Sequence, residues 1–163
     1  MVKWFNLFGR QYLGFWSLGL MLFVLQEMPY MIMPLIKIKS NPIMNMKETS
    51  PLLNFFEKFL GISCVLVMCF IVKEDLPLFA MGRGVHRAGF VMAVLFLWAY
   101  YLGWLLYFRG YQRLWVMLGL LVAMPPLYYA SIGLWRENPL LFILGIIFGI
   151  VHLLHVHGNL KDF

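Results

Sequence analysis

The sequence predicts an all-α fold: a polytopic integral membrane protein built as a bundle of five transmembrane helices. Hydrophobic residues make up 63% of the 163 residues, charged residues only 12%, and the mean hydropathy is +0.81. A soluble domain of this length cannot bury so much apolar surface. The chain also contains five apolar runs, and a helix needs about 20 apolar residues to cross the hydrocarbon core.

The first span is expected over about 11–36. Its uncharged part, 11–26, would reach only about 24 Å as a helix, which is less than the core thickness. The span must therefore continue past Glu27, where Pro29 and Pro34 should bend it. The basic, apolar start of the chain resembles a signal sequence, but no small-residue cleavage site follows, so a retained span is expected.

The second span is expected over about 53–72. Only 14 uncharged residues, 59–72, form its apolar part. The helix must therefore reach back toward its N-terminus and place Glu57 and Lys58 at or near the membrane interface.

The third and fourth spans, about 88–108 and 114–135, are the most regular. The third has 21 residues without Asp, Glu, Lys, Arg or His, and the fourth has 22 residues interrupted only by Pro125 and Pro126. These prolines lack backbone donors and should kink the fourth helix or end its first half. The short basic link between the two spans predicts an antiparallel hairpin.

The fifth span is expected over about 139–157. Gly145 and Gly149 form a GxxxG pair, which allows close helix packing. His152 follows on the same face and should point into the bundle, while His155 lies at the edge of that face.

No linker is long enough for a second domain, so 1–163 is expected to form one membrane domain, in a multi-pass protein of the cell membrane. The net charge is +6, but the cations lie between apolar runs, where they would meet lipid headgroups. The lipid bilayer is therefore the expected partner, and nucleic acid is not. The 13 Lys and Arg residues divide six and seven between the two sides, which does not fix the orientation.

Glu27 is the strongest candidate for a functional residue. An ionisable group within an apolar stretch costs several kcal/mol to insert, and neighbouring prolines free backbone carbonyls, as in transporters with broken helices. The alternative is that the helix ends near Met28 and that Glu27 is an interfacial anchor or pairs with a Lys.

Five spans place the end of the first helix, the start of the second and the end of the fifth on one side. That side would hold a layer of four ionisable residues: Glu27, Glu57, His152 and His155. Such a layer suits a ligand or proton site, or a divalent metal for which His152 and His155 are the candidate ligands. Hydrogen-bonded packing is the alternative for the two histidines.

The opposite side is expected to make headgroup contacts and salt bridges through Arg10, Asp75, Arg83, His86, Arg87, Arg136 and Glu137.

Aromatic residues form a further pattern. Tyr100, Trp104 and Tyr107 follow one another at i, i+4 and i+7, which predicts the wall of a cavity for a flat or hydrophobic ligand. An aromatic belt at the membrane interface, together with ordinary packing, explains the same pattern.

The leading functional hypothesis is binding or transport of a small hydrophobic or protonated solute. One alternative is a membrane-embedded metal or haem enzyme that uses the C-terminal histidines. Another is a non-catalytic accessory subunit or assembly factor of a membrane complex, which would pack on a partner through the Gly145 and Gly149 face and the loops. Besides the bilayer, the alternatives for a partner are a second copy of the chain and a membrane partner subunit. The chain has no phosphate-binding glycine loop, nucleophile elbow, CxxC or HExxH motif, so no enzyme class, cofactor or substrate is indicated.

Overall fold

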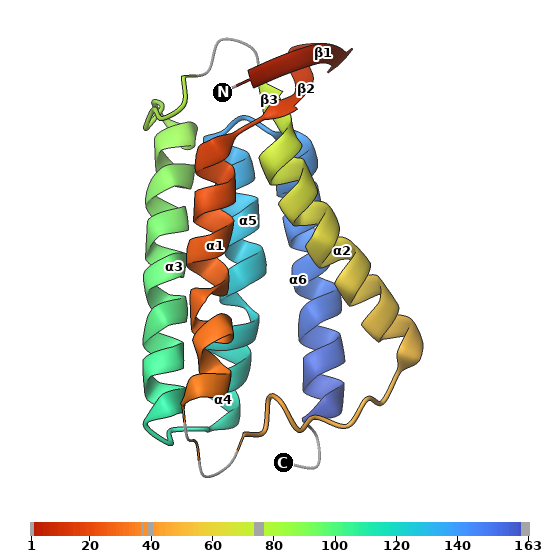
Figure 1. Cartoon of the computed structure of the whole chain (residues 1–163), viewed down its shortest axis with the longest axis vertical. Helices are drawn as coiled ribbons and strands as arrows, with labels where there is room; N and C mark the ends of the chain where they lie inside the picture. The colour runs from red at the N-terminus through yellow and green to blue at the C-terminus, as the bar shows by residue number, and fades with distance from the viewer. Residues whose placement is uncertain (1, 37, 39–40, 74–76, 161–163) are drawn as a thin grey trace.

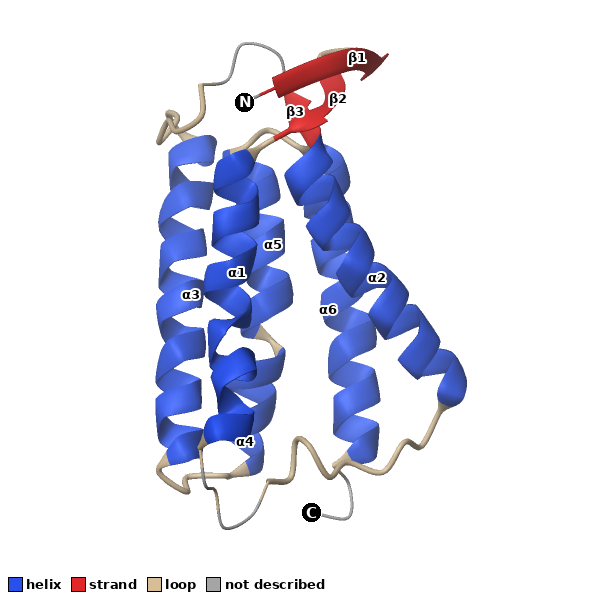
Figure 2. Ribbon diagram, viewed as in Figure 1, coloured by secondary structure: helices blue, strands red, loops and turns tan. Residues whose placement is uncertain are grey.

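The computed structural model describes residues 2–36, 38, 41–73 and 77–160 and shows a helical bundle with a small sheet at one end (Figures 1 and 2). Five helices are long and apolar enough to cross a membrane, as the sequence predicted. They are Ser17–Leu35, Pro51–Phe70, Val85–Phe108, Leu114–Trp135 and Pro139–Asn159.

The all-α prediction is wrong at the sheet. Strands β1 (Val2–Phe8) and β2 (Gln11–Phe15) form an antiparallel hairpin, and β2 pairs with β3 (Ile71–Lys73). The hairpin turns at Gly9, whose φ of 53° glycine adopts without strain.

The sheet also changes the limits of two expected spans. The first apolar helix begins at Ser17 rather than at residue 11, and the second ends at Phe70 rather than at residue 72. Hydropathy alone cannot separate these residues from the helices, because an apolar strand and an apolar helix have the same composition.

Two of the long helices begin with the same N-terminal motif, a capping side chain followed by proline. In α2 (Pro51–Phe70) the Ser50 side chain caps the helix by accepting from the Leu53 N–H, at 3.4 Å. In α6 (Pro139–Asn159) Asn138 accepts from the Leu141 N–H, at 3.1 Å. A proline follows each cap, at the first helical position, where its missing N–H costs no hydrogen bond.

The fourth apolar segment is interrupted as expected. It consists of α4 (Leu114–Val116), a π-helical turn over Met117–Val122 and α5 (Met124–Trp135). Pro125 and Pro126 cannot donate backbone hydrogen bonds, and just before them the Ala123 N–H bonds to the carbonyl of Leu118, five residues back, at 2.9 Å.

Helix α5 is the centre of the bundle. In an 18-residue stretch of its segment, Leu114–Trp135, 67% of the residues are buried, against 22–28% in the corresponding stretches of the other four apolar helices. It lies between α3 (Val85–Phe108) and α6, with α1 (Ser17–Ile32) across it (Figure 1). Helix α1 continues through Pro29 to Ile32, and a short 3₁₀ turn, Met33–Leu35, follows it.

Glycines allow α5 and its neighbours to touch through their backbones. A Cβ added at Gly89 would lie 2.6 Å from the Trp135 nitrogen, and one at Gly145 would lie 2.6 Å from the Ala130 nitrogen. Gly149 also faces α5, with Pro126 at 3.3 Å from the position of an added Cβ. The Gly145 and Gly149 face is thus occupied within the chain and is not open to another subunit.

We expect Gly145→Ala to lower the free energy of unfolding by about 1–3 kcal/mol, because the added methyl group meets backbone atoms that cannot move aside. Gly119→Ala is the matched control, since a Cβ there meets nothing within 4 Å. It should be neutral, or stabilising by up to about 1 kcal/mol. Reversible unfolding in mixed detergent micelles measures both changes, and equal effects would contradict the close packing.

A polar turn between α5 and α6 joins the bundle to the sheet. The Arg136 guanidinium lies 4.5 Å from the Trp16 ring centroid and donates to the Pro77 carbonyl at 3.1 Å. Burial lowers the pKa of Arg136 to about 10, so this residue stays charged at neutral pH. Glu137 pairs with Lys73 of β3, and His86 Nε2 lies 3.9 Å from the same carboxylate.

This turn accounts for part of the salt bridging expected on this side. The hydrogen bond from Lys73, helped by nearby positive charge, lowers the pKa of the Glu137 carboxyl. Asp75, which was expected in the same group, lies outside the described residues.

Glu137→Gln should reduce the loss of folding stability that the chain shows when the pH is lowered. Because the pKa of Glu137 is lower in the folded chain, its stabilisation is complete above the unfolded value of about 4.3 and is lost as the pH falls through the folded value. The side chain is 32% exposed, so the effect should stay under about 1 kcal/mol.

Thermal unfolding in a non-ionic detergent at neutral and at acidic pH measures this difference. Glu48→Gln, on an exposed loop, is the control and should keep the wild-type acid dependence. An unchanged acid dependence in Glu137→Gln would contradict the role of the Lys73 pair.

Candidate functional site

A cavity of about 570 Å³ lies inside the bundle, and all five long apolar segments contribute to its lining. Helices α1 and α2 lie close together at the sheet and diverge toward their other ends (Figure 1). Two contacts hold the closed end: the Trp16 N–H bonds to the Cys69 carbonyl at 2.8 Å, and Gly19 brings α1 against the Met68 carbonyl. The cavity is thus lined on one side by α1 and on another by α2.

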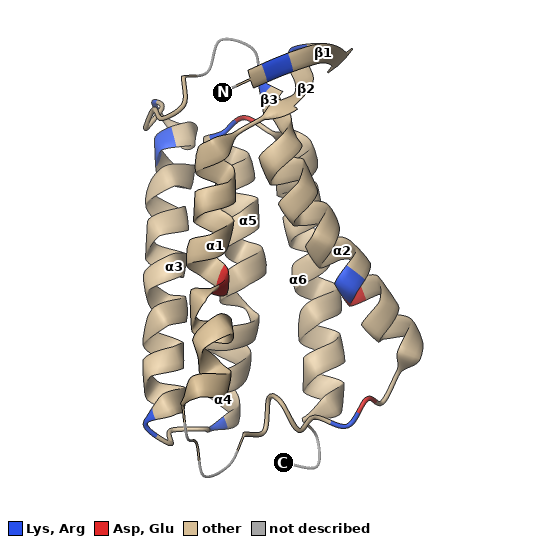
Figure 3. Cartoon of the chain, viewed as in Figure 1, with Lys and Arg blue, Asp and Glu red and all other residues tan. Residues whose placement is uncertain are grey.

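Four Glu, Lys and His residues line the cavity: Glu27, Glu57, Lys58 and His152. Glu27 lies on α1, and Glu57 and Lys58 lie on α2. Figure 3 shows an acidic position on α1 and an adjacent acidic and basic position on α2. Three of the four residues of the expected ionisable layer therefore face one cavity. The fourth, His155, is buried behind it and reaches the site through Glu57.

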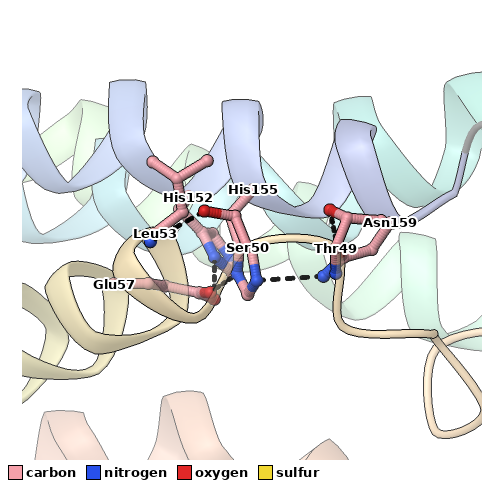
Figure 4. A network of polar contacts seen from close by, with 7 residues as sticks. All are labelled: Thr49, Ser50, Leu53, Glu57, His152, His155 and Asn159. Atoms are coloured by element: carbon pink, nitrogen blue, oxygen red, sulfur yellow. Dashed lines mark hydrogen bonds and ion pairs between the residues drawn. The ribbon is translucent and has the colours of Figure 1, made fainter.

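Glu57 bridges the two histidines of α6. Its Oε1 lies 2.6 Å from His152 Nδ1, and its Oε2 pairs with His155 Nδ1 (Figure 4). The i, i+3 spacing of the histidines places both rings on the side of α6 that faces α2. The His152 ring also stacks on Phe148, with centroids 5.0 Å apart and planes 21° apart.

The network continues into the loop before α2. Asn159 Nδ2 lies 3.0 Å from His155 Nε2, and Asn159 Oδ1 accepts from the Thr49 backbone N–H at 3.0 Å and from its hydroxyl at 2.6 Å (Figure 4). Asn159 could have been identified from its spacing, because it follows His155 by four residues and so lies on the same helical face. Thr49 carries no such signal, because only the tertiary fold brings its loop to α6.

Tyrosine hydroxyls hold α1 against the centre of the bundle. Tyr129 donates to Gln26 Oε1 at 2.6 Å, and Tyr101 donates to the Leu25 carbonyl at 2.7 Å. Pro29 frees that carbonyl, since it is the residue whose N–H would otherwise reach Leu25. The freed carbonyl is thus satisfied by Tyr101 and is not available to a solute.

The expected aromatic wall divides into two parts. Tyr100 and Trp104 line the cavity, and Tyr30 meets Trp104 edge-on with centroids 5.5 Å apart. Tyr107 does not line it. Its hydroxyl instead donates to Asn41 Oδ1 at 2.6 Å and accepts from the Ile43 N–H at 3.3 Å, which fixes the loop after α1.

A polar atom in the cavity wall is left without a partner. The indole N–H of Trp104 is buried and has no hydrogen-bond acceptor in the described part of the chain. Buried donors are nearly always paired, and the neighbouring Tyr100 side chain interacts with this indole.

The described side chains do not form a metal-binding site. Among the described residues, no group of three or more His, Cys, Asp or Glu is arranged to hold an ion. The Nδ1 atoms of His152 and His155 are both taken by Glu57, and Cys64 and Cys69 are buried and unpaired.

Comparison with known proteins gives no relative from which to transfer a role. No protein-family model, no curated protein and no solved structure matches the chain. The chemistry of the site is therefore derived from its own side chains.

The pairing of Glu57 with His152 should appear as a coupling energy. Removing one partner leaves the other poorly paired in a partly buried site, so Glu57→Ala and His152→Ala should each destabilise the fold. Together they should cost less than the sum of the single changes, with a coupling of about 0.5–3 kcal/mol.

A double-mutant cycle of unfolding free energies in mixed micelles gives this number. The control cycle combines Glu57→Ala with His157→Ala, because His157 is exposed on α6 and Glu57 forms its ion pairs with His152 and His155 instead. Additive effects in the first cycle would contradict the pairing.

Proposed function

We propose that this chain is a multi-pass protein of the cell membrane that binds or transports a small, largely apolar solute carrying a positive charge. The observation that carries the proposal is the cavity of about 570 Å³, where the Glu27 carboxylate lies among aromatic and aliphatic walls. Cavities of about 300–1,000 Å³ are typical of small-molecule sites.

The outer surface of the bundle supports a membrane location. Large apolar side chains face outward from the helices, including Leu95 at 59%, Trp98 at 71% and Ile150 at 57% exposure. Apolar surface of this extent is unfavourable in water and matches the hydrocarbon of a bilayer.

The charge of Glu27 favours a cationic solute. No Lys, Arg or His of the described residues forms an ion pair with it, although Lys58 lies at the exposed edge of the same cavity. A carboxylate in apolar surroundings is stabilised by an opposite charge, which a bound cation supplies. The rings of Tyr30, Tyr100 and Trp104 add faces that attract cations.

The test uses tetraphenylphosphonium, an apolar cation, and tetraphenylborate, an anion of similar size and shape. The purified protein in detergent should bind labelled tetraphenylphosphonium saturably, and labelled tetraphenylborate, measured in a separate sample, should not bind saturably. Glu27→Gln should weaken binding at least about 10-fold, the effect of about 1.4 kcal/mol, because the amide keeps the shape and removes the charge.

Glu48→Gln removes a carboxylate from the exposed loop and should leave binding unchanged. Absence of saturable binding, or equal affinity in Glu27→Gln, would overturn the proposal. Uptake into protein-containing vesicles then separates transport from binding alone.

A further inference from the structure

We propose that His152 is the proton-binding residue of the cavity and that a proton on His152 and a cationic solute compete there. The second half of this proposal rests on the function proposed above. The first half concerns only the hydrogen bonds of the two histidines, which have different freedom to take up a second proton.

His155 is held in one neutral form by the contacts around it. A backbone N–H can only donate, so the Asn159 atom that faces the Thr49 N–H must be the amide oxygen. The Asn159 NH₂ group therefore faces His155 Nε2 and donates to it. His155 Nε2 must then accept and carry no proton, which leaves the proton on Nδ1, where it is donated to Glu57.

A second proton on His155 would place two donors face to face. To relieve this, the Asn159 amide would have to turn over and lose the hydrogen bond from the Thr49 backbone N–H, which can only donate, while the Thr49 hydroxyl would have to turn and accept. The network of Figure 4 therefore opposes charging of His155.

His152 is under no such restriction. Its Nδ1 faces Glu57 Oε1, so it too donates from Nδ1, but no described group forms a hydrogen bond with its Nε2. His152 lines the cavity, and its ring lies flat on Phe148. It can take a proton at Nε2 from the cavity without breaking any bond, with Glu57 as the counter-ion.

The charges around His152 make its proton and a bound cation compete. Glu57 and Lys58 face the cavity from α2, Glu27 and Tyr30 from α1, and Tyr100 and Tyr129 from α3 and α5. With His152 neutral, the two Glu and one Lys give the cavity a net charge of −1; with His152 protonated, the net charge is zero. A cation is attracted to the first state, so its entry favours departure of the proton from Nε2 to water.

Nuclear magnetic resonance of protein labelled with ¹⁵N-histidine tests the proton site directly, and with four histidines the spectrum is tractable. From about pH 8 to about pH 5, a range that brackets the ordinary histidine titration, the signal removed by His152→Asn should change from neutral to doubly protonated. One signal should keep the neutral Nδ1-protonated form throughout and persist in both His152→Asn and His157→Asn. A His152 signal that stays in one neutral form would overturn the proton site.

The competition is tested with tetraphenylphosphonium over the same range. Its affinity for the wild type should rise at least about 5-fold from acidic to neutral pH, the lower end of coupling between linked sites. His152→Asn keeps a donor near the position of Nδ1 and should lose this histidine-dependent rise, whereas His157→Asn should keep it.

The two proposals fail in different ways. Absence of tetraphenylphosphonium binding overturns the proposed function and the competition, but leaves the proton site to the resonance experiment. Binding that depends on Glu27, with the same pH dependence in wild type and His152→Asn, overturns the competition alone.

Discussion

Backbone contact between α5 and its two neighbours is the constraint on which the rest of the structure depends. Gly89 on α3 and Gly145 on α6 let these helices approach α5 until main-chain atoms touch. The three helices form a tightly packed layer, and α1 and α2 lie against it. Helices α1 and α2 approach each other closely at the sheet end, where Gly19 lies against the Met68 carbonyl. Farther from the sheet, both helices line the cavity.

The small sheet and the polar turn give the bundle one closed end. Pairing of β2 with β3 joins the start of α1 to the end of α2, and Arg136 and Glu137 connect this corner to α5 and α6. At the opposite end, hydrogen bonds from Thr49 and to Tyr107 attach the loop between α1 and α2 to the helices. This loop is therefore attached to α3 at Ile43 and to α6 at Thr49.

The sequence predicted the helices well because their signal is local: an uninterrupted apolar run, a proline pair or a cap followed by proline. Alternating helix directions, which follow from the number of spans, also led to the expectation that Glu27, Glu57 and His152 lie at one level of the bundle, and these three line one cavity. The sequence missed β1 and β2, because hydropathy does not distinguish apolar strands from helices. The sequence could not predict that Glu57 pairs with both histidines or that Thr49 bonds to Asn159, since these contacts depend on side-chain geometry between distant segments.

The divergence of α2 from α1 has a mechanical consequence. Helix α2 is attached near Phe70, and Glu57 lies 13 residues away, about 20 Å along the axis at 1.5 Å per residue. A tilt of only about 10° around the attached end would move Glu57 by about 3 Å, which exceeds the tolerance of a hydrogen bond. Helix α2 also packs along α6, and Thr49 just before its start is bonded to Asn159, so the contacts of Glu57 with the two histidines lie where α2 is joined to α6 and oppose such a tilt.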